Sequence, residues 1–307
     1  MGFEVRSAGV CARLAGLVAC IASVLSPLAA GAAGWDSRVS TGFEIRGETA
    51  LAGPGEFDFW LTWLEGEARR DLDERVELVL AGDFRVIGYD FDGSPFAPLP
   101  EPWEQVHVLR LRPSLEIGLS DAWSLVAGPI FEISRESEAD VSDALRGGGA
   151  FAVGYRSGDG LEIALGLIVQ SEIEDDAYLA PYVRLDIPIV AGLHLTARSE
   201  TSRGGDAELV YRFLEDFELA FGGGYRRERF RLNDDGTRPR RKGVGEEESS
   251  FLAARFAWTV VDPVRLEAYI GTTLDGEVRL EDRRGHKLAD ADYDAAPFGG
   301  LRIGVRF

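Results

Sequence analysis

Hydrophobic residues occupy every second position along most of this chain of 307 residues. In residues 161–169, for example, every odd-numbered position carries leucine, isoleucine or valine. Successive side chains of a β-strand point to opposite faces, so each such segment has one apolar face and one polar face. About fourteen segments follow this pattern, near residues 38–48, 57–68, 75–88, 104–119, 123–134, 147–157, 161–171, 178–188, 192–201, 207–213, 217–228, 250–259, 264–274 and 296–307.

The segments have the length of membrane-crossing strands, which is roughly 9–11 residues for a tilted strand. Beyond residue 33, no apolar run approaches the roughly 18 residues of a membrane helix. Tight turns alternate with longer links, so that all turns fall at one end of the strands and all longer links at the other, as in outer-membrane barrels. The turns lie at 71–74, 120–122, 157–160, 188–192, 214–216 and 260–263, and the other links near 49–56, 89–103, 135–146, 172–177, 202–206, 229–249 and 275–295.

The face opposite the apolar one carries thirteen arginines and thirteen acidic residues. A soluble β-sandwich could bury the apolar faces and leave these charges in water, so composition alone leaves that fold open. Strand length and turn asymmetry favour lipid outside, where one arginine at the midplane would cost about 2–4 kcal/mol. The exceptions to the parity are Arg227 and His107, both near the predicted outer ends. We expect the following residues to line a lumen: Arg110, Arg112, Glu116, Arg184, Asp186, Arg198, Arg212, Arg226, Arg255, Arg265, Glu267, Arg302 and Arg306.

The predicted fold is therefore all-β, a transmembrane antiparallel up-and-down barrel of about fourteen strands, with twelve as the alternative. Its short turns would be periplasmic and its longer loops extracellular. The segment near 57–68 is ambiguous, because Phe57, Phe59 and Leu61 share one parity with Glu65 and Glu67. A β-bulge in this segment would resolve the conflict.

The first 33 residues have the features of a cleavable signal peptide. Arg6 and Arg13 precede an apolar run at 14–25, and small residues follow at the expected cleavage region, Ala30, Ala32 and Ala33. A lipoprotein-type site at Cys20 is the less favoured alternative. Both cysteines of the chain, Cys11 and Cys20, lie in this segment, so we expect an exported single-domain barrel over residues 34–307 without disulfides.

The chain ends in an alternating strand, LRIGVRF, whose last residue is Phe307. With the signal peptide and the repeated strands, this strand resembles those of Gram-negative outer-membrane β-barrel proteins, of a porin-like kind. The resemblance implies an outer-membrane location, contact with lipid and lipopolysaccharide, and assembly by the barrel assembly machinery. It also implies that Leu301, Ile303, Val305 and Phe307 form the assembly signal.

Charge argues against a nucleic-acid partner, because 52 acidic residues outnumber 33 basic ones. The balanced inner face has two interpretations: ion pairs that fill the lumen, or a water channel between charged walls. A barrel of about fourteen strands is too wide for side chains to fill, which favours a channel for passive diffusion of small hydrophilic solutes. The alternatives are a non-conducting structural or surface-interaction barrel and, with less support, an outer-membrane hydrolase.

We predict no catalytic residue, cofactor or metal site. His286, with acidic residues at 290, 292 and 294, is the one place for an omptin-like protease, but the spacing matches no omptin motif. His107 on the outward parity would suit an outer-membrane phospholipase, yet no matching serine motif is evident. Residues 90–101 imitate a calcium loop, although proline stands at 95 where glycine is needed. The basic run 238–242 could contact lipopolysaccharide phosphates.

Overall fold

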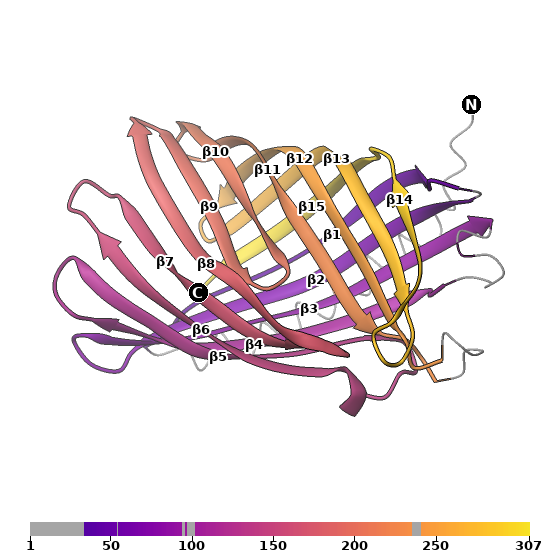
Figure 1. Ribbon diagram of the computed structural model, residues 1–307. Coiled ribbons are helices and arrows are strands. Elements are labelled where there is room, and N and C mark those ends of the chain that lie inside the picture. Colours follow the sequence, from indigo (N-terminus) through magenta and orange to yellow (C-terminus); the bar gives the residue numbers. More distant parts are fainter. Residues whose placement is uncertain (1–33, 54, 94–95, 97–101, 235–240) are drawn as a thin grey trace.

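The computed structural model describes residues 34–53, 55–93, 96, 102–234 and 241–307 (Figure 1). Fourteen antiparallel strands form a closed barrel, as the alternation predicts, and the alternative of twelve is wrong. The strands are β1 Asp36–Ala50, β2 Gly55–Asp71, β3 Val76–Gly93, β4 Gln105–Gly118, β5 Trp123–Glu136, β6 Leu145–Arg156, β7 Glu162–Glu172, β8 Asp175–Val190, β9 Leu193–Thr201, β10 Gly204–Leu214, β11 Phe217–Arg231, β12 Val244–Val261, β13 Val264–Glu281 and β15 Pro297–Arg306. An additional strand, β14 Lys287–Tyr293, and a short 3₁₀ turn, η1 Ser142–Ala144, complete the described elements.

The ring closes between the first strand and the last. β15 pairs with β1, where Leu301 stands opposite Phe43, and with β13 on its other side. β14 pairs with the far half of β13, beyond the point where β15 ends (Figure 1). No helix among the described residues is long and apolar enough to cross a membrane.

The two ends of the barrel differ. Connections of two to five residues join β2 to β3, β4 to β5, β6 to β7, β8 to β9, β10 to β11 and β12 to β13, and we call this the turn end. The opposite, loop end carries the longer connections, together with the tight β7–β8 and β9–β10 hairpins. Several strands extend further toward the loop end than the alternation predicts, since β12 begins at Val244 and β13 continues to Glu281.

The outer surface of the barrel wall is apolar. Phe221 on β11 is 61% exposed and Ile270 on β13 is 68% exposed, and similar side chains surround the barrel. Exposed apolar area of this extent is unfavourable in water and matches the lipid-facing band of a membrane barrel.

The parity of β2 has a different explanation from the predicted bulge. β2 pairs with β3 in one continuous register from Gly55 to Asp71, and the irregularity lies in β1, between Arg46 and Thr49. Phe57 and Phe59 are 1% and 5% exposed, so they point into the barrel on the same face as the acidic residues. The bulge prediction is therefore wrong, and these rings need apolar partners inside the barrel.

Their partners form what we call the aromatic core, at the loop end of the barrel interior. Trp103 is fully buried, with its ring 5.2 Å from that of Phe230 and 5.5 Å from that of Phe91. One side of the core comes from β1–β4 and the segments that join them, and the other from the far ends of β11–β14. Its members are Leu51, Phe57, Phe59, Ile87, Tyr89, Phe91, Phe96, Trp103, Val106, Val108, Phe230, Leu232, Val278, Leu280, Ala291 and Tyr293.

The far ends of β11–β13 fold into the barrel. On β11 the odd-numbered residues face outward near the membrane, as the 61% exposure of Phe221 shows, and the register to β12 continues unbroken to Arg231. Arg229 keeps this parity but is only 1% exposed, because it contacts Glu172 and the carbonyl of Ile173 from the β7–β8 hairpin. We call residues 227–231, 244–250 and 275–281, with β14, the infolded sheet.

Candidate functional site

The turn-end half of the lumen is charged and partly open to water. Arg302 donates to Ser40 Oγ at 3.0 Å and also pairs with Glu65, and these two charged side chains are 35% and 40% exposed. On the neighbouring strand β13, Arg265 pairs with Glu267 at 2.8 Å, with the arginine 34% exposed. Side chains with this exposure are hydrated rather than packed, so we call this half of the lumen the vestibule.

The residues predicted to line the lumen lie at several depths. Arg110 is 2% exposed near the loop end, whereas the side chain of Arg306 is 72% exposed at the turn end, where it pairs with Asp36. Arg212, 52% exposed, pairs with Glu218 near the same rim.

The others lie between these two levels. Most of them are in ion pairs: Arg226 with Glu44, Arg255 with Glu208, Arg265 and Arg302 with Glu267, Arg184 with Glu116, and Asp186 with His194. The remaining two are placed by the sheet register, in which Arg198 stands opposite Asp206 and Arg112 opposite Ala81.

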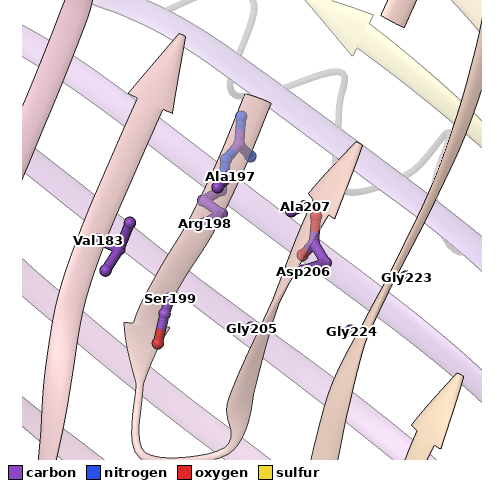
Figure 2. Close-up of a pocket in the computed structure, with 9 residues that line it drawn as sticks. All are labelled: Val183, Ala197, Arg198, Ser199, Gly205, Asp206, Ala207, Gly223 and Gly224. Carbon is purple, nitrogen blue, oxygen red and sulfur yellow. The ribbon is translucent and has the colours of Figure 1, made fainter. Parts of the chain in front are cut away.

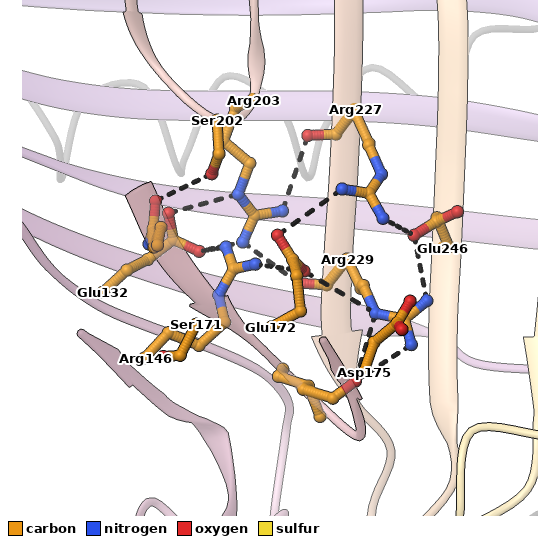
Figure 3. A network of polar contacts seen from close by, with 12 residues as sticks. Glu132, Arg146, Ser171, Glu172, Asp175, Ser202, Arg203, Arg227, Arg229 and Glu246 are labelled. Carbon is orange, nitrogen blue, oxygen red and sulfur yellow. Dashed lines mark hydrogen bonds and ion pairs between the residues drawn. The ribbon is translucent and has the colours of Figure 1, made fainter. Parts of the chain in front are cut away.

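Above the vestibule, Glu132 on β5 binds three arginines. Figure 3 shows two of them, Arg146 and Arg203. Arg110 Nε donates to Glu132 Oε2 at 2.9 Å, and Arg146 and Arg203 donate to the other carboxylate oxygen. The Glu132 side chain is fully buried, and each of the three arginine side chains is at most 5% exposed. One buried carboxylate thus joins β4, β5, β6 and the β9–β10 hairpin.

Arg203 lies at the tip of the β9–β10 hairpin and completes the edge of β11. The pairing of β10 with β11 ends at Gly204 and Arg226, so the next residues of β11 have no neighbouring strand on that side. Arg203 fills this position: its Nη2 donates to the carbonyl of Arg229 at 3.0 Å, and its own carbonyl accepts from the amide of Arg227 at 3.0 Å. Its Nη1 also pairs with Glu228 at 3.0 Å. Buried backbone groups need such partners, so this side chain substitutes for a missing strand.

A second set of ion pairs joins β6 and β7 to the infolded sheet (Figure 3). Glu172 pairs with Arg146 at 2.6 Å on the barrel wall and lies 3.7 Å from Arg229 on the infolded sheet. Arg229 also forms ion pairs with Glu246 at 3.0 Å and with Glu281 at 2.6 Å. We call these contacts, together with those of Glu132 and Arg203, the ionic layer.

The loop end is therefore closed by two layers of different chemistry. The infolded sheet packs one face on β1–β4 through the aromatic core and the other on β5–β8 through the ionic layer. At the edge of the infolded sheet, the backbone of Arg231 on β11 forms a parallel β-bridge with the backbone of Arg135 on β5.

The loop above the ionic layer is held by polar contacts. The pKa of Asp140 is lowered because the backbone amide and hydroxyl of Ser142 both donate to this carboxylate. The pKa of Lys242 is raised by its hydrogen bonds to Asp143 and Asp234. These contacts fasten the η1 segment to the β11–β12 connection.

The ionic layer includes residues that sequence reasoning missed. Arg146, Glu172, Arg203 and Glu246 lie in segments predicted as links between strands, or at their margins. Arg229 and Arg231 extend the parity of Arg227, which was noted only as an exception. Three arginines at alternate positions on the apolar face were the signal that this face leaves the lipid.

Neither histidine considered for hydrolysis has a full set of catalytic partners among the described residues. The His286 ring lies 3.2 Å from Asp282 and is 73% exposed, while Asp290 pairs with Lys287. His107 Nε2 lies 3.3 Å from Ser137 Oγ, a serine not anticipated from the sequence. The same nitrogen is shared with Gln105 Oε1, also at 3.3 Å, and no group described in this structure orients the other ring nitrogen.

No group of His, Cys, Asp and Glu among the described residues is placed to hold a metal ion. Ser94, Glu101 and Pro95 of the calcium-like segment lie outside the described residues, as does most of the basic run 238–242. Ala30, Ala32 and Ala33 lie outside them as well. Leu301 and Ile303 of the terminal strand are 52% and 40% exposed, on the outer face of the wall.

The wall carries a shallow hollow of about 270 Å³ between β8 and β11 (Figure 2). Small residues at outward positions of β9–β11 form it, among them Ala197, Gly205, Ala207 and Gly223. It is an indentation of the apolar outer surface of the wall.

No protein-family model and no curated protein matches this sequence. Among solved structures, a FadL homologue of Pseudomonas aeruginosa matches with a TM-score of 0.50 and 11% identity, over 89% of this chain and 90% of that one. The chain has the fold of an outer-membrane β-barrel. An outer-membrane channel of Pseudomonas putida F1 has a TM-score of 0.48 and 11% identity, over 89% of this chain and 96% of that one. OprB of Pseudomonas putida has a TM-score of 0.42 and 10% identity, over 89% and 94% of the two chains.

Proposed function

We propose that this protein is an outer-membrane channel for small hydrophilic solutes, and that the structure represents its closed state. The turn end would face the periplasm and the loop end the cell exterior. The observation that carries the proposal is the hydrated vestibule, in which charged side chains such as Glu65 remain 40% exposed inside a closed wall. A barrel built only as a scaffold would not need water-exposed charges beneath a sealed end.

The solute class follows from the charges that face the vestibule. Arginines and carboxylates alternate around it in pairs, for example Arg255 with Glu208 and Arg265 with Glu267. Such walls replace part of the hydration of a polar solute and offer nothing to an apolar one. Liposome swelling should therefore respond to small sugars and amino acids.

Planar-bilayer recording tests the channel itself. We expect discrete current steps from the folded protein, separated by long closed periods because the loop end is packed. The control is the same preparation after boiling, with folding followed by heat-modifiable electrophoretic mobility. Folded protein that never conducts, even when the ionic layer is disrupted as described below, would contradict the proposal.

A second candidate function is a non-conducting structural or surface-interaction barrel. The packed loop end favours it, since Trp103 and Glu132 are both fully buried there. In that case neither the protein nor its variants would conduct, and its partners would bind the outer loops. We further propose lipid, lipopolysaccharide and the barrel assembly machinery as partners, the last through Leu301, Ile303, Val305 and Phe307.

A further inference from the structure

The infolded sheet contacts the barrel wall on two faces, and pulling the sheet away from the wall would expose different groups on each face. On the side of β1–β4, separation would expose the rings of Trp103, Phe230 and Tyr89 to water, and this cost grows with the apolar area exposed. On the side of β5–β8, separation would expose carboxylates and guanidinium groups, which regain the hydration that they lost on burial. Opening along the ionic layer is therefore the less costly movement.

The connectivity also favours movement on that side. Among the described residues, side chains make the contacts across the ionic layer between the wall and the infolded sheet. The exceptions are the backbone bridge of Arg231 with Arg135 and the hydrogen bond of the Arg227 amide to the Arg203 carbonyl. On the other side, β14 is fastened to the β1–β2 connection by a bridge between Leu51 and Tyr293 and by a backbone hydrogen bond of 2.7 Å from Ala52 to Asp292.

We propose that the channel opens along the ionic layer, with Glu132 and Arg203 as its latch, while the aromatic core stays packed. β5–β8 separate from the infolded sheet and from the tip of the β9–β10 hairpin, which stays on β11 through the bonds of Arg203 to Glu228, to the Arg229 carbonyl and to the Arg227 amide. The contact that breaks is that of Glu132 with Arg203, and water follows the charged groups from the vestibule to the outside. This inference rests on the proposed channel function and names its gate.

The first test removes the charge of the latch. Glu132→Gln keeps the shape of the side chain but leaves three arginines around a neutral amide, so the closed state loses charge-assisted hydrogen bonds and the open fraction should rise at least about tenfold in planar bilayers. The matched control is Glu162→Gln, which alters a glutamate–arginine pair at 2.8 Å near the turn end, with Glu162 44% exposed. It should leave the open fraction unchanged. An equal response of both variants would overturn the proposal.

The second test locks each side separately. The chain has no cysteine after residue 20, so introduced pairs are the only thiols of the exported protein. Arg135→Cys with Arg231→Cys locks the ionic side, and Ala52→Cys with Asp292→Cys locks the side of the aromatic core. The current through each variant is measured in planar bilayers before and after oxidation. Comparing the two states of the same variant separates the effect of the disulfide from that of the substitutions.

Oxidation of the Arg135→Cys, Arg231→Cys protein should abolish the current, and reductant should restore it. Oxidation of the Ala52→Cys, Asp292→Cys protein should leave the current unchanged. The reverse result would place the gate in the aromatic core. A block by both locks would mean that the infolded sheet leaves as one body, and a block by neither would place the opening elsewhere; each contradicts the proposal. Absence of current in every reduced form, with normal heat-modifiable mobility, would instead contradict the channel function and the gate with it.

Discussion

In this barrel, a single arginine residue makes hydrogen bonds to a strand edge that a neighbouring strand would normally make. Arg203 supplies hydrogen bonds to the edge of β11 where β10 has ended, and it also binds Glu132 and Glu228. A guanidinium group has five donors in a fixed plane, which lets one residue serve carboxylates and carbonyls together. Lysine, with its compact ammonium, could not contact all of these groups at once.

Replacing Arg203 should therefore destabilise the folded barrel. Arg203→Gln leaves Glu228 and part of Glu132 buried without their partner, and we expect the free energy of unfolding to fall by about 3 kcal/mol. Urea unfolding in detergent micelles, followed by electrophoretic mobility, would measure it. Arg306→Gln is the control, because its pair with Asp36 is 72% and 50% exposed and should contribute little. Similar losses in both variants would contradict the role given to Arg203.

At the scale of the element, β11 changes surroundings along its length. Its first half separates lipid from the vestibule, and its second half separates the ionic layer from the aromatic core. The alternation predicted the strand and its faces, because one apolar side is a local property of the sequence. It could not predict that residues beyond Arg226 enter the barrel, because that depends on β9 and β10 being short and on partners far away in the chain, such as Glu172.

Two phenylalanines of β11 allow a matched test of this change. Phe230 is fully buried in the aromatic core, and Phe221 is 61% exposed on the lipid face. Phe230→Ala should lower the free energy of unfolding by about 3–5 kcal/mol, because it leaves a cavity between packed rings. Phe221→Ala should lower it less, since lipid fills the space that the ring leaves. The same urea unfolding assay compares them, and a larger effect at Phe221 would argue against an infolded β11.

For the whole molecule, the sequence predicted the fourteen strands of the ring, their order and the difference between the two ends. It did not predict β14, which lies in the segment 275–295 expected to be a link. Phe57 and Phe59 share one parity with Glu65 and Glu67, and this pattern alone fits either a bulge or apolar side chains that enter the barrel. The apolar partners of these rings, Phe230 and Tyr293 among them, become neighbours only when the sheet folds inward. The closure of the loop end is thus a tertiary property that no single segment reveals.

The orientation of the barrel can be tested in intact cells with single cysteines. His286 lies at the loop end with its side chain 73% exposed, and Asp121 is exposed in the β4–β5 turn at the other end. If the loop end faces outward, a membrane-impermeant maleimide should label His286→Cys in intact cells, and it should label Asp121→Cys only after the outer membrane is permeabilised. Labelling of Asp121→Cys but not of His286→Cys in intact cells would mean an inverted barrel, in which the ionic layer would close the periplasmic side.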